Sequence, residues 1–176
     1  KAHELNDNDF EVHRLMAEVN LSGRNFRVAE RHASKAYKMV PNDPRVLSVY
    51  GEVSLRLGKI DQGLDALKLA LEIDPIAQGK TNSDSRTSPV LFGEYLARNK
   101  DNCLELVEKL EDIDSKSWLL TAKLCSDEEH DITEEDWYKR GKEEFNDKDW
   151  AAEVDSFRLN NEGAKESLIE FAESLS

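Results

Sequence analysis

The chain has 176 residues, enough for one domain of ordinary size, with 39% apolar and 35% charged residues. It contains no apolar run long enough to cross a bilayer, which argues against a membrane-spanning helix. Its net charge of −13 disfavours nucleic acids and anionic membranes as partners, because both are polyanions.

The two cysteines and the N-terminal residues 1–9 bear on the cellular compartment of the protein. Cys103 and Cys125 are too few for a disulfide framework and lie in no metal-ligand spacing, so we expect both to be small buried hydrophobic residues. A reducing environment is the simpler interpretation, and we predict a cytoplasmic protein. Residues 1–9 form a polar lead rather than a signal peptide, and because the chain begins without Met we expect a fragment or a processed product.

Residues 44–77 predict two amphipathic helices joined by a turn at Gly58 and Lys59. Pro75 ends the second helix, because proline lacks the backbone donor that a helix needs. Residues 10–43 show the same layout, and Pro41 lies one thirty-four-residue period before Pro75. Small residues recur at corresponding places in the two copies, namely Ala17, Ala29 and Ala36 in the first and Gly51, Gly63 and Ala70 in the second.

Over residues 10–77 this pattern resembles the tetratricopeptide repeat family, although Ser54 and Leu67 stand where that family has aromatic residues. The resemblance implies an all-α fold, namely a right-handed superhelical solenoid of helix-turn-helix hairpins with a C-terminal capping helix. It also implies a close approach of helices at Ala36 and Ala70, and a concave groove that binds peptides.

The rest of the chain is predicted to continue the same single domain, residues 10–176. Residues 77–89 are rich in Gly, Ser, Thr and Asn and predict a loop. Residues 90–125 predict a degenerate third repeat. Residues 134–162 predict a further repeat, with Trp137 and Gly141 at its fourth and eighth positions, and residues 163–176 predict the capping helix.

No catalytic or metal-ligating constellation stands out. The four histidines lack partners at ligand spacing, and His13 occupies a packing position. The acidic run 127–136 lacks the spacing of a calcium loop, and Gly79-Lys80-Thr81 lacks the upstream glycine of a phosphate-binding loop. We therefore predict no catalytic residue, no metal site and no cofactor.

The remaining candidate site is the groove that the resemblance implies, lined by the first helix of each repeat. Mapped onto this chain, its positions give a surface of mixed charge with scattered apolar residues, which suits an extended or helical peptide. These residues are Glu11, Arg14, Leu15, Glu18, Leu21, Arg45, Ser48, Val49, Glu52, Leu55, Arg56, Tyr138, Lys139, Lys142 and Phe145.

These observations predict a protein–protein interaction scaffold or adaptor that binds a partner protein or peptide. Two alternatives stay open: the non-catalytic repeat region of a larger enzyme, such as a sugar or sulfate transferase, and a self-assembly module that forms homo-oligomers. Residues 1–77 hold eleven Lys/Arg and twelve Asp/Glu, whereas residues 78–176 hold thirteen and twenty-five. A partner of the second part is therefore expected to be basic.

Overall fold

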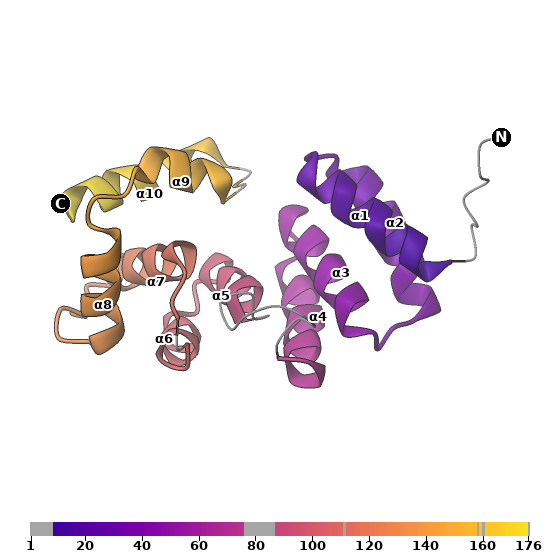
Figure 1. Ribbon diagram of the computed structural model, residues 1–176, viewed down its shortest axis with the longest axis horizontal. Helices are drawn as coiled ribbons and strands as arrows, with labels where there is room; N and C mark the ends of the chain where they lie inside the picture. The colour runs from indigo at the N-terminus through magenta and orange to yellow at the C-terminus, as the bar shows by residue number, and fades with distance from the viewer. Residues whose placement is uncertain (1–8, 76–86, 111, 158, 160, 176) are drawn as a thin grey trace.

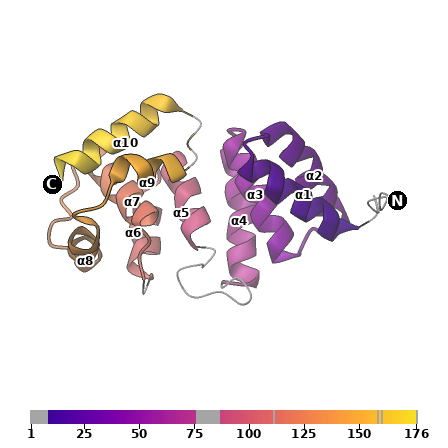
Figure 2. The same ribbon diagram turned by 45° about the horizontal axis from the view of Figure 1, so that its top comes forward.

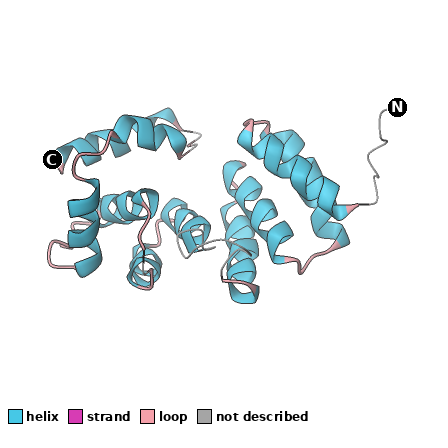
Figure 3. Cartoon of the chain, in the orientation of Figure 1, coloured by secondary structure: helices cyan, strands magenta, loops and turns pink. Residues whose placement is uncertain are grey.

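The computed structural model describes all residues except 1–8, 76–86, 111, 158, 160 and 176. Within this part of the chain, every regular element is a helix, which confirms the predicted all-α class (Figure 1 and Figure 3). In chain order the helices are α1 (Phe10–Ser22), α2 (Phe26–Met39), α3 (Pro44–Arg56), α4 (Ile60–Ile73), α5 (Thr87–Leu96), α6 (Lys100–Glu108), α7 (Ser115–Asp127), α8 (Asp136–Phe145), α9 (Trp150–Ser156) and α10 (Glu162–Ser174).

Short acidic or amide side chains mark where several helices begin. At α3, Asp43 accepts hydrogen bonds from the backbone N–H groups of Arg45 (2.8 Å) and Val46 (3.3 Å), and Pro44 occupies the first turn, where no backbone donor is needed. A side chain of the same kind caps α1, α7, α9 and α10, namely Asp9, Asp114, Asp149 and Asn161.

One turn geometry ends the odd-numbered helices α1, α3, α5 and α7. Each turn contains a residue with left-handed φ, namely Arg24 (59°), Gly58 (76°), Arg98 (60°) and Glu129 (53°). The N–H of the next residue donates to the carbonyl five residues earlier, as in Asn25 to Asn20 (2.8 Å), Lys59 to Ser54 (2.9 Å), Asn99 to Glu94 (3.0 Å) and His130 to Cys125 (2.9 Å). The four helices can therefore be aligned residue by residue from this turn.

The helices stack as successive hairpins. α1 packs on α2, α3 on α4, α5 on α6 and α7 on α8, while α2, α4 and α6 each also contact the first helix of the next hairpin. α9 packs on α10, and α10 returns to contact α7. The stack runs from α1 and α2 at one end to α7 and α8 at the other (Figure 2). Each hairpin thus buries its apolar surface mainly against its sequence neighbours.

Small residues allow the close approach of helices in this stack. A Cβ atom on Gly51 would lie 2.6 Å from Cγ of Leu67 and 2.9 Å from the Gly63 carbonyl oxygen. Ala36 and Ala70 are fully buried, as the repeat pattern predicts. Cys103 and Cys125 are also fully buried, which confirms their predicted role as small core residues.

An aromatic cluster joins α7, α8 and α9. The Trp118 ring stacks on Tyr138 and Trp150, with centroids 5.6 and 5.8 Å apart, and its Nε1 donates to the Tyr138 carbonyl at 3.2 Å. A Cβ atom on Gly141 would lie 2.7 Å from Cγ of Trp118. Gly141 is therefore needed because α8 rests directly on the Trp118 ring.

Two sequence-based expectations need correction. α5 begins at Thr87, so the last residues of the predicted loop 77–89 are helical, and the earlier part lies outside the described residues, as does Gly79-Lys80-Thr81. The predicted repeat 134–162 pairs α8 with α9, and the Phe145 and Trp150 rings of these helices do lie 6.1 Å apart, but the larger interfaces are those of α8 with α7 and of α9 with α10. The physical reason is the large apolar surface of α7, centred on Trp118, which needs α8 as its cover.

Candidate functional site

The predicted groove residues of α1 form an ion network beside an exposed leucine. Arg14 donates to the carboxylate of Glu11 through Nε (3.0 Å) and Nη2 (2.7 Å), and it also bonds to Glu18. The hydrogen bond from Arg14 lowers the pKa of Glu11, so this carboxylate is ionised at neutral pH. Leu15 is 47% exposed beside these charges.

The network extends to α3. Nη1 of Arg45 lies 3.6 Å from Oε2 of Glu11, and its Nη2 lies 2.8 Å from Asp43. Ser48 and Glu52 follow Arg45 along α3 and are partly exposed. We refer to the seven predicted residues Glu11, Arg14, Leu15, Glu18, Arg45, Ser48 and Glu52 as the open face.

Three other predicted residues of the same helices lie in the core. Leu21, Val49 and Leu55 are 7%, 6% and 4% exposed, and their side chains pack in the hydrophobic clusters between hairpins. Their prediction as groove residues is corrected, because an apolar side chain on a helix flanked by two neighbours is buried by those neighbours.

Arg56, which was also predicted to line the groove, instead links distant parts of the chain. Its Cζ lies 4.5 Å from the centroid of the Phe92 ring on α5, and its Nη2 donates to the carbonyl of Phe157 at the end of α9 (3.2 Å). Lys116 of α7 lies over the same ring at 4.3 Å. Arg56 is therefore a structural contact between α3, α5 and α9.

The four predicted residues of α8 do not join the open face. Tyr138 and Phe145 are buried against Trp118, while Lys139 and Lys142 are exposed and Lys139 pairs with Glu134 at 2.8 Å. α8 is the second helix of its hairpin, whereas the open face lies on first helices. Burial therefore corrects the assignment of Tyr138 and Phe145 to the groove, whereas the assignment of Lys139 and Lys142 stays a prediction.

The equivalent surface of the fourth hairpin lies on α7, which α10 contacts. Alignment from the shared turn places Leu120 at the position of Leu15, and Lys123 at the position of Glu18. Leu120 is fully buried in the cluster that contains Leu168 of α10, and Nζ of Lys123 lies 5.8 Å from the Phe171 ring centroid on α10.

Sequence reasoning missed this role of α7 because three of the four turn residues with left-handed φ are Arg or Glu. The usual signal for such a turn is glycine, which stands only at Gly58 among the four. Without that signal, the fourth first-helix position was assigned to α8.

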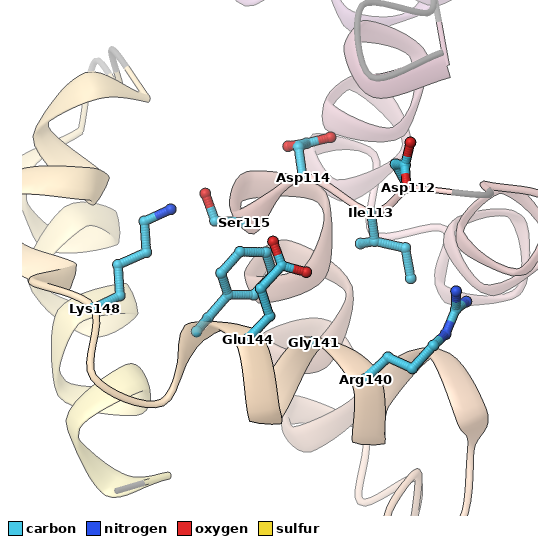
Figure 4. Close-up of a pocket in the computed structure, with 9 residues that line it drawn as sticks. Asp112, Ile113, Asp114, Ser115, Arg140, Gly141, Glu144 and Lys148 are labelled. Carbon is cyan, nitrogen blue, oxygen red and sulfur yellow. The ribbon is translucent and has the colours of Figure 1, made fainter.

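A separate cleft of about 460 Å³ lies where the segment before α7 faces α8 (Figure 4). Asp112, Asp114 and Ser115 line one wall, and Arg140, Glu144 and Lys148 come from α8 and the turn after it. Several of these groups have local partners. Asp114 accepts from the Ser117 N–H (2.9 Å), Ser115 bonds to Glu153, and Lys148 lies 3.5 Å from Glu153. Glu153 of α9 thus ties the start of α7 to the turn that follows α8.

Among the described residues, no set of three or more His, Cys, Asp or Glu side chains is placed to hold a metal ion. The same part of the chain has no helix with the length and apolar character needed to cross a bilayer. Comparison with models of known protein families and with curated proteins finds no match for this chain.

Proposed function

We propose that the chain is a protein–protein interaction module of the tetratricopeptide type, a right-handed superhelix of hairpins. Its open face binds a helical segment of a partner. Successive hairpins with one shared turn support the repeat assignment, and the distance from Arg24 to Gly58 equals the thirty-four-residue period.

The single observation that carries the binding proposal is the position of α10. It packs on α7, where Phe171 of α10 lies near Lys123, the residue that corresponds to Glu18 of the open face. Leu120, which corresponds to Leu15, is buried on the same helix. The fold thus accommodates a helix on this side of a first helix. Leu15 remains 47% exposed, with ionised groups around it, which suits an amphipathic helix with one apolar anchor and a polar rim.

Selection of helical peptides on the immobilised chain tests this function. A library of amphipathic helices is displayed, the selected peptides are synthesised, and their affinity is measured for the wild type and for Leu15→Asp. We expect Leu15→Asp to weaken binding at least about tenfold, because a charge replaces the apolar anchor.

Leu69→Asp is the matched control, because Leu69 is another exposed leucine, at 37%, and lies on the second helix α4. It should leave affinity unchanged. Selected peptides that bind both variants equally well would place the binding surface elsewhere on the molecule.

Self-assembly is a second candidate, supported by the exposed end of the stack. Val19 of α1 is 66% exposed, whereas the aligned residues Val53 of α3 and Leu124 of α7 are 1% and 0% exposed. In α3 this surface packs against the preceding hairpin, so another copy of the chain could stack on α1 in the same way.

Light scattering over a range of protein concentrations tests self-assembly. The mass should rise with concentration in the wild type, and Val19→Asp should abolish the rise. A constant monomer mass at all concentrations would eliminate this second candidate.

A further inference from the structure

A cleft of about 340 Å³ lies between α4, α5 and α6, away from the open face. Its apolar lining comes from Leu71, Val90 and Leu106, one residue from each helix. A carboxylate, Glu94, also lines it and is only 1% exposed. The cleft therefore combines an apolar wall with a nearly buried negative charge.

The charge on Glu94 is maintained by specific hydrogen bonds. Burial alone would raise the pKa of Glu94, but hydrogen bonds from Lys68, Asn99 and Asn102 outweigh burial, and the pKa is lowered. Nζ of Lys68 lies 2.7 Å from Oε1, and Nδ2 of Asn99 donates to Oε2 at 2.7 Å. Glu94 is thus ionised at neutral pH.

The hairpin itself does not require a carboxylate at this position. Glu94 supplies the backbone carbonyl that accepts the turn hydrogen bond, and the aligned residues in the other three turns are Asn20, Ser54 and Cys125. All three are neutral. Because a buried charge is costly unless it is compensated, the carboxylate is a local specialisation of the third hairpin.

The balance of charge in the cleft is negative. Glu72 and Glu105 line it together with Glu94, and Lys68 is its one cationic lining residue among those described. The Lys68 side chain is 50% exposed, and Glu105 is already bonded to Lys109 at 2.6 Å. Lys68 is therefore the solvent-exposed member of its pair with Glu94, and an incoming cation can take its place.

We propose that this cleft binds an arginine side chain from a basic segment of a partner protein. The guanidinium pairs with Glu94 in place of the Lys68 ammonium, and the aliphatic stem lies along Leu71, Val90 and Leu106. Arginine fits better than lysine, because its planar fork can donate two parallel hydrogen bonds to a carboxylate and is less strongly hydrated. The inference does not depend on the open face.

The probe is acetyl-Ala-Leu-Arg-Leu-Ala-amide, and its twin with citrulline in place of arginine is the control of equal shape without charge. Binding to the full chain is followed by amide chemical shifts in NMR titrations. The arginine peptide should shift amides of α4, α5 and α6 and bind at least about tenfold tighter than the citrulline peptide.

Two variants of the chain sharpen the test. Lys68→Ala should tighten binding of the arginine peptide several-fold, because it removes the resident competitor, while Lys139→Ala on α8 should have no effect. Glu94→Gln should weaken binding at least about tenfold. Thermal unfolding of each variant checks that it is folded. If Glu94→Gln is unstable, the affinity of Lys68→Ala still tests the proposal, because that variant keeps Glu94.

Equal binding of the two peptides, no binding of either at millimolar concentration, or unchanged affinity in Lys68→Ala would overturn the proposal. Leu15→Asp should leave this binding intact, so failure of the open face and failure of the cleft are distinguishable.

Discussion

At Gly141, α8 lies so close to the Trp118 ring that no side chain fits. Replacement by Ala would put Cβ 2.7 Å from Cγ of Trp118, in a cluster already filled by Tyr138 and Trp150. We expect Gly141→Ala to lower the free energy of unfolding by about 1–3 kcal/mol, as overpacked cores do. Urea denaturation with tryptophan fluorescence measures the change.

The control is Gly163→Ala near the start of α10. There a Cβ atom would come no closer than 3.4 Å to its nearest neighbour, Oδ1 of Asn161, which is ordinary contact. Its stability should match the wild type within about 0.5 kcal/mol, as for other surface substitutions. Equal stability of both variants would mean that α8 does not rest on Trp118 in solution.

The two buried thiols predict a loss of stability in alkali. Burial raises the pKa of Cys103 to about 12 and that of Cys125 to about 11. These folded-state pKa values exceed the ordinary thiol pKa of 9.0, so the protonated thiols stabilise the folded state fully below pH 9. This stabilisation is lost as the pH rises through the window up to the raised pKa. Between pH 9 and its raised pKa, about 12 for Cys103 and about 11 for Cys125, each thiol should reduce the free energy of unfolding by roughly 1.4 kcal/mol per pH unit.

The measurement is denaturant unfolding at a series of pH values from neutral upward for the wild type and Cys103→Ala. The variant should be less stable at neutral pH but should show a shallower alkaline loss. Parallel curves for the two proteins would show that Cys103 ionises normally in the folded state.

At the scale of the helix and its turn, the residues with left-handed φ allow two matched predictions about stability. Arg24 adopts φ of 59° and Gly58 adopts φ of 76° in equivalent turns. A residue with Cβ is disfavoured there by roughly 1 kcal/mol relative to Gly. Arg24→Gly should therefore stabilise the protein, and Gly58→Ala should destabilise it by a similar amount, as measured by chemical denaturation.

The test is that the two variants change the free energy of unfolding in opposite directions. Without the effect of the left-handed turn, both substitutions should change stability only slightly and alike. If Arg24→Gly is destabilising, the turn after α1 is not left-handed at that residue.

The same turns explain how far the sequence predicts the fold. The pattern of small residues and prolines identified the first two hairpins, because Ala36, Ala70, Gly51 and Gly63 are needed where helices nearly touch. Beyond residue 77 the distance between turns changes, being longer from Gly58 to Arg98 and shorter from Arg98 to Glu129. The fixed period then no longer identifies equivalent residues.

Gly141 shows why a short motif misled the assignment of the candidate site. A large residue followed four positions later by glycine is typical of a first helix in tetratricopeptide repeats, and Trp137 and Gly141 fit that spacing. In the structure Gly141 is small because of Trp118, which lies on a different helix. That contact depends on tertiary packing, and so does the cover that α10 provides for α7. Neither leaves a signal in local sequence.

At the scale of the whole molecule, Arg56 connects the first half to the last helices. Its hydrogen bond to the Phe157 carbonyl spans 101 residues of sequence. Arg56→Ala should lower the protection of α9 and α10 amides against hydrogen exchange by about 1 kcal/mol, the size expected for one hydrogen bond from a charged group at a partly exposed site. Exchange followed by mass spectrometry measures this.

Arg45→Ala is the matched control, because Arg45 forms surface ion pairs with Glu11 and Asp43 at the far side of α3. It should leave exchange in α9 and α10 unchanged. If Arg56→Ala has no more effect than Arg45→Ala on these helices, the link does not hold the C-terminal pair in place.

This long-range bond changes how the stack can come apart. A row of hairpins that touch only their neighbours can unzip from either end, one unit at a time, with partly unfolded forms in between. The bond between Arg56 and Phe157 ties the last helices to the second hairpin, so fraying at one end loosens a contact made near the other. Unfolding should then approach an all-or-none event, and a chain that lacks this bond should lose its cooperativity before it loses its helices.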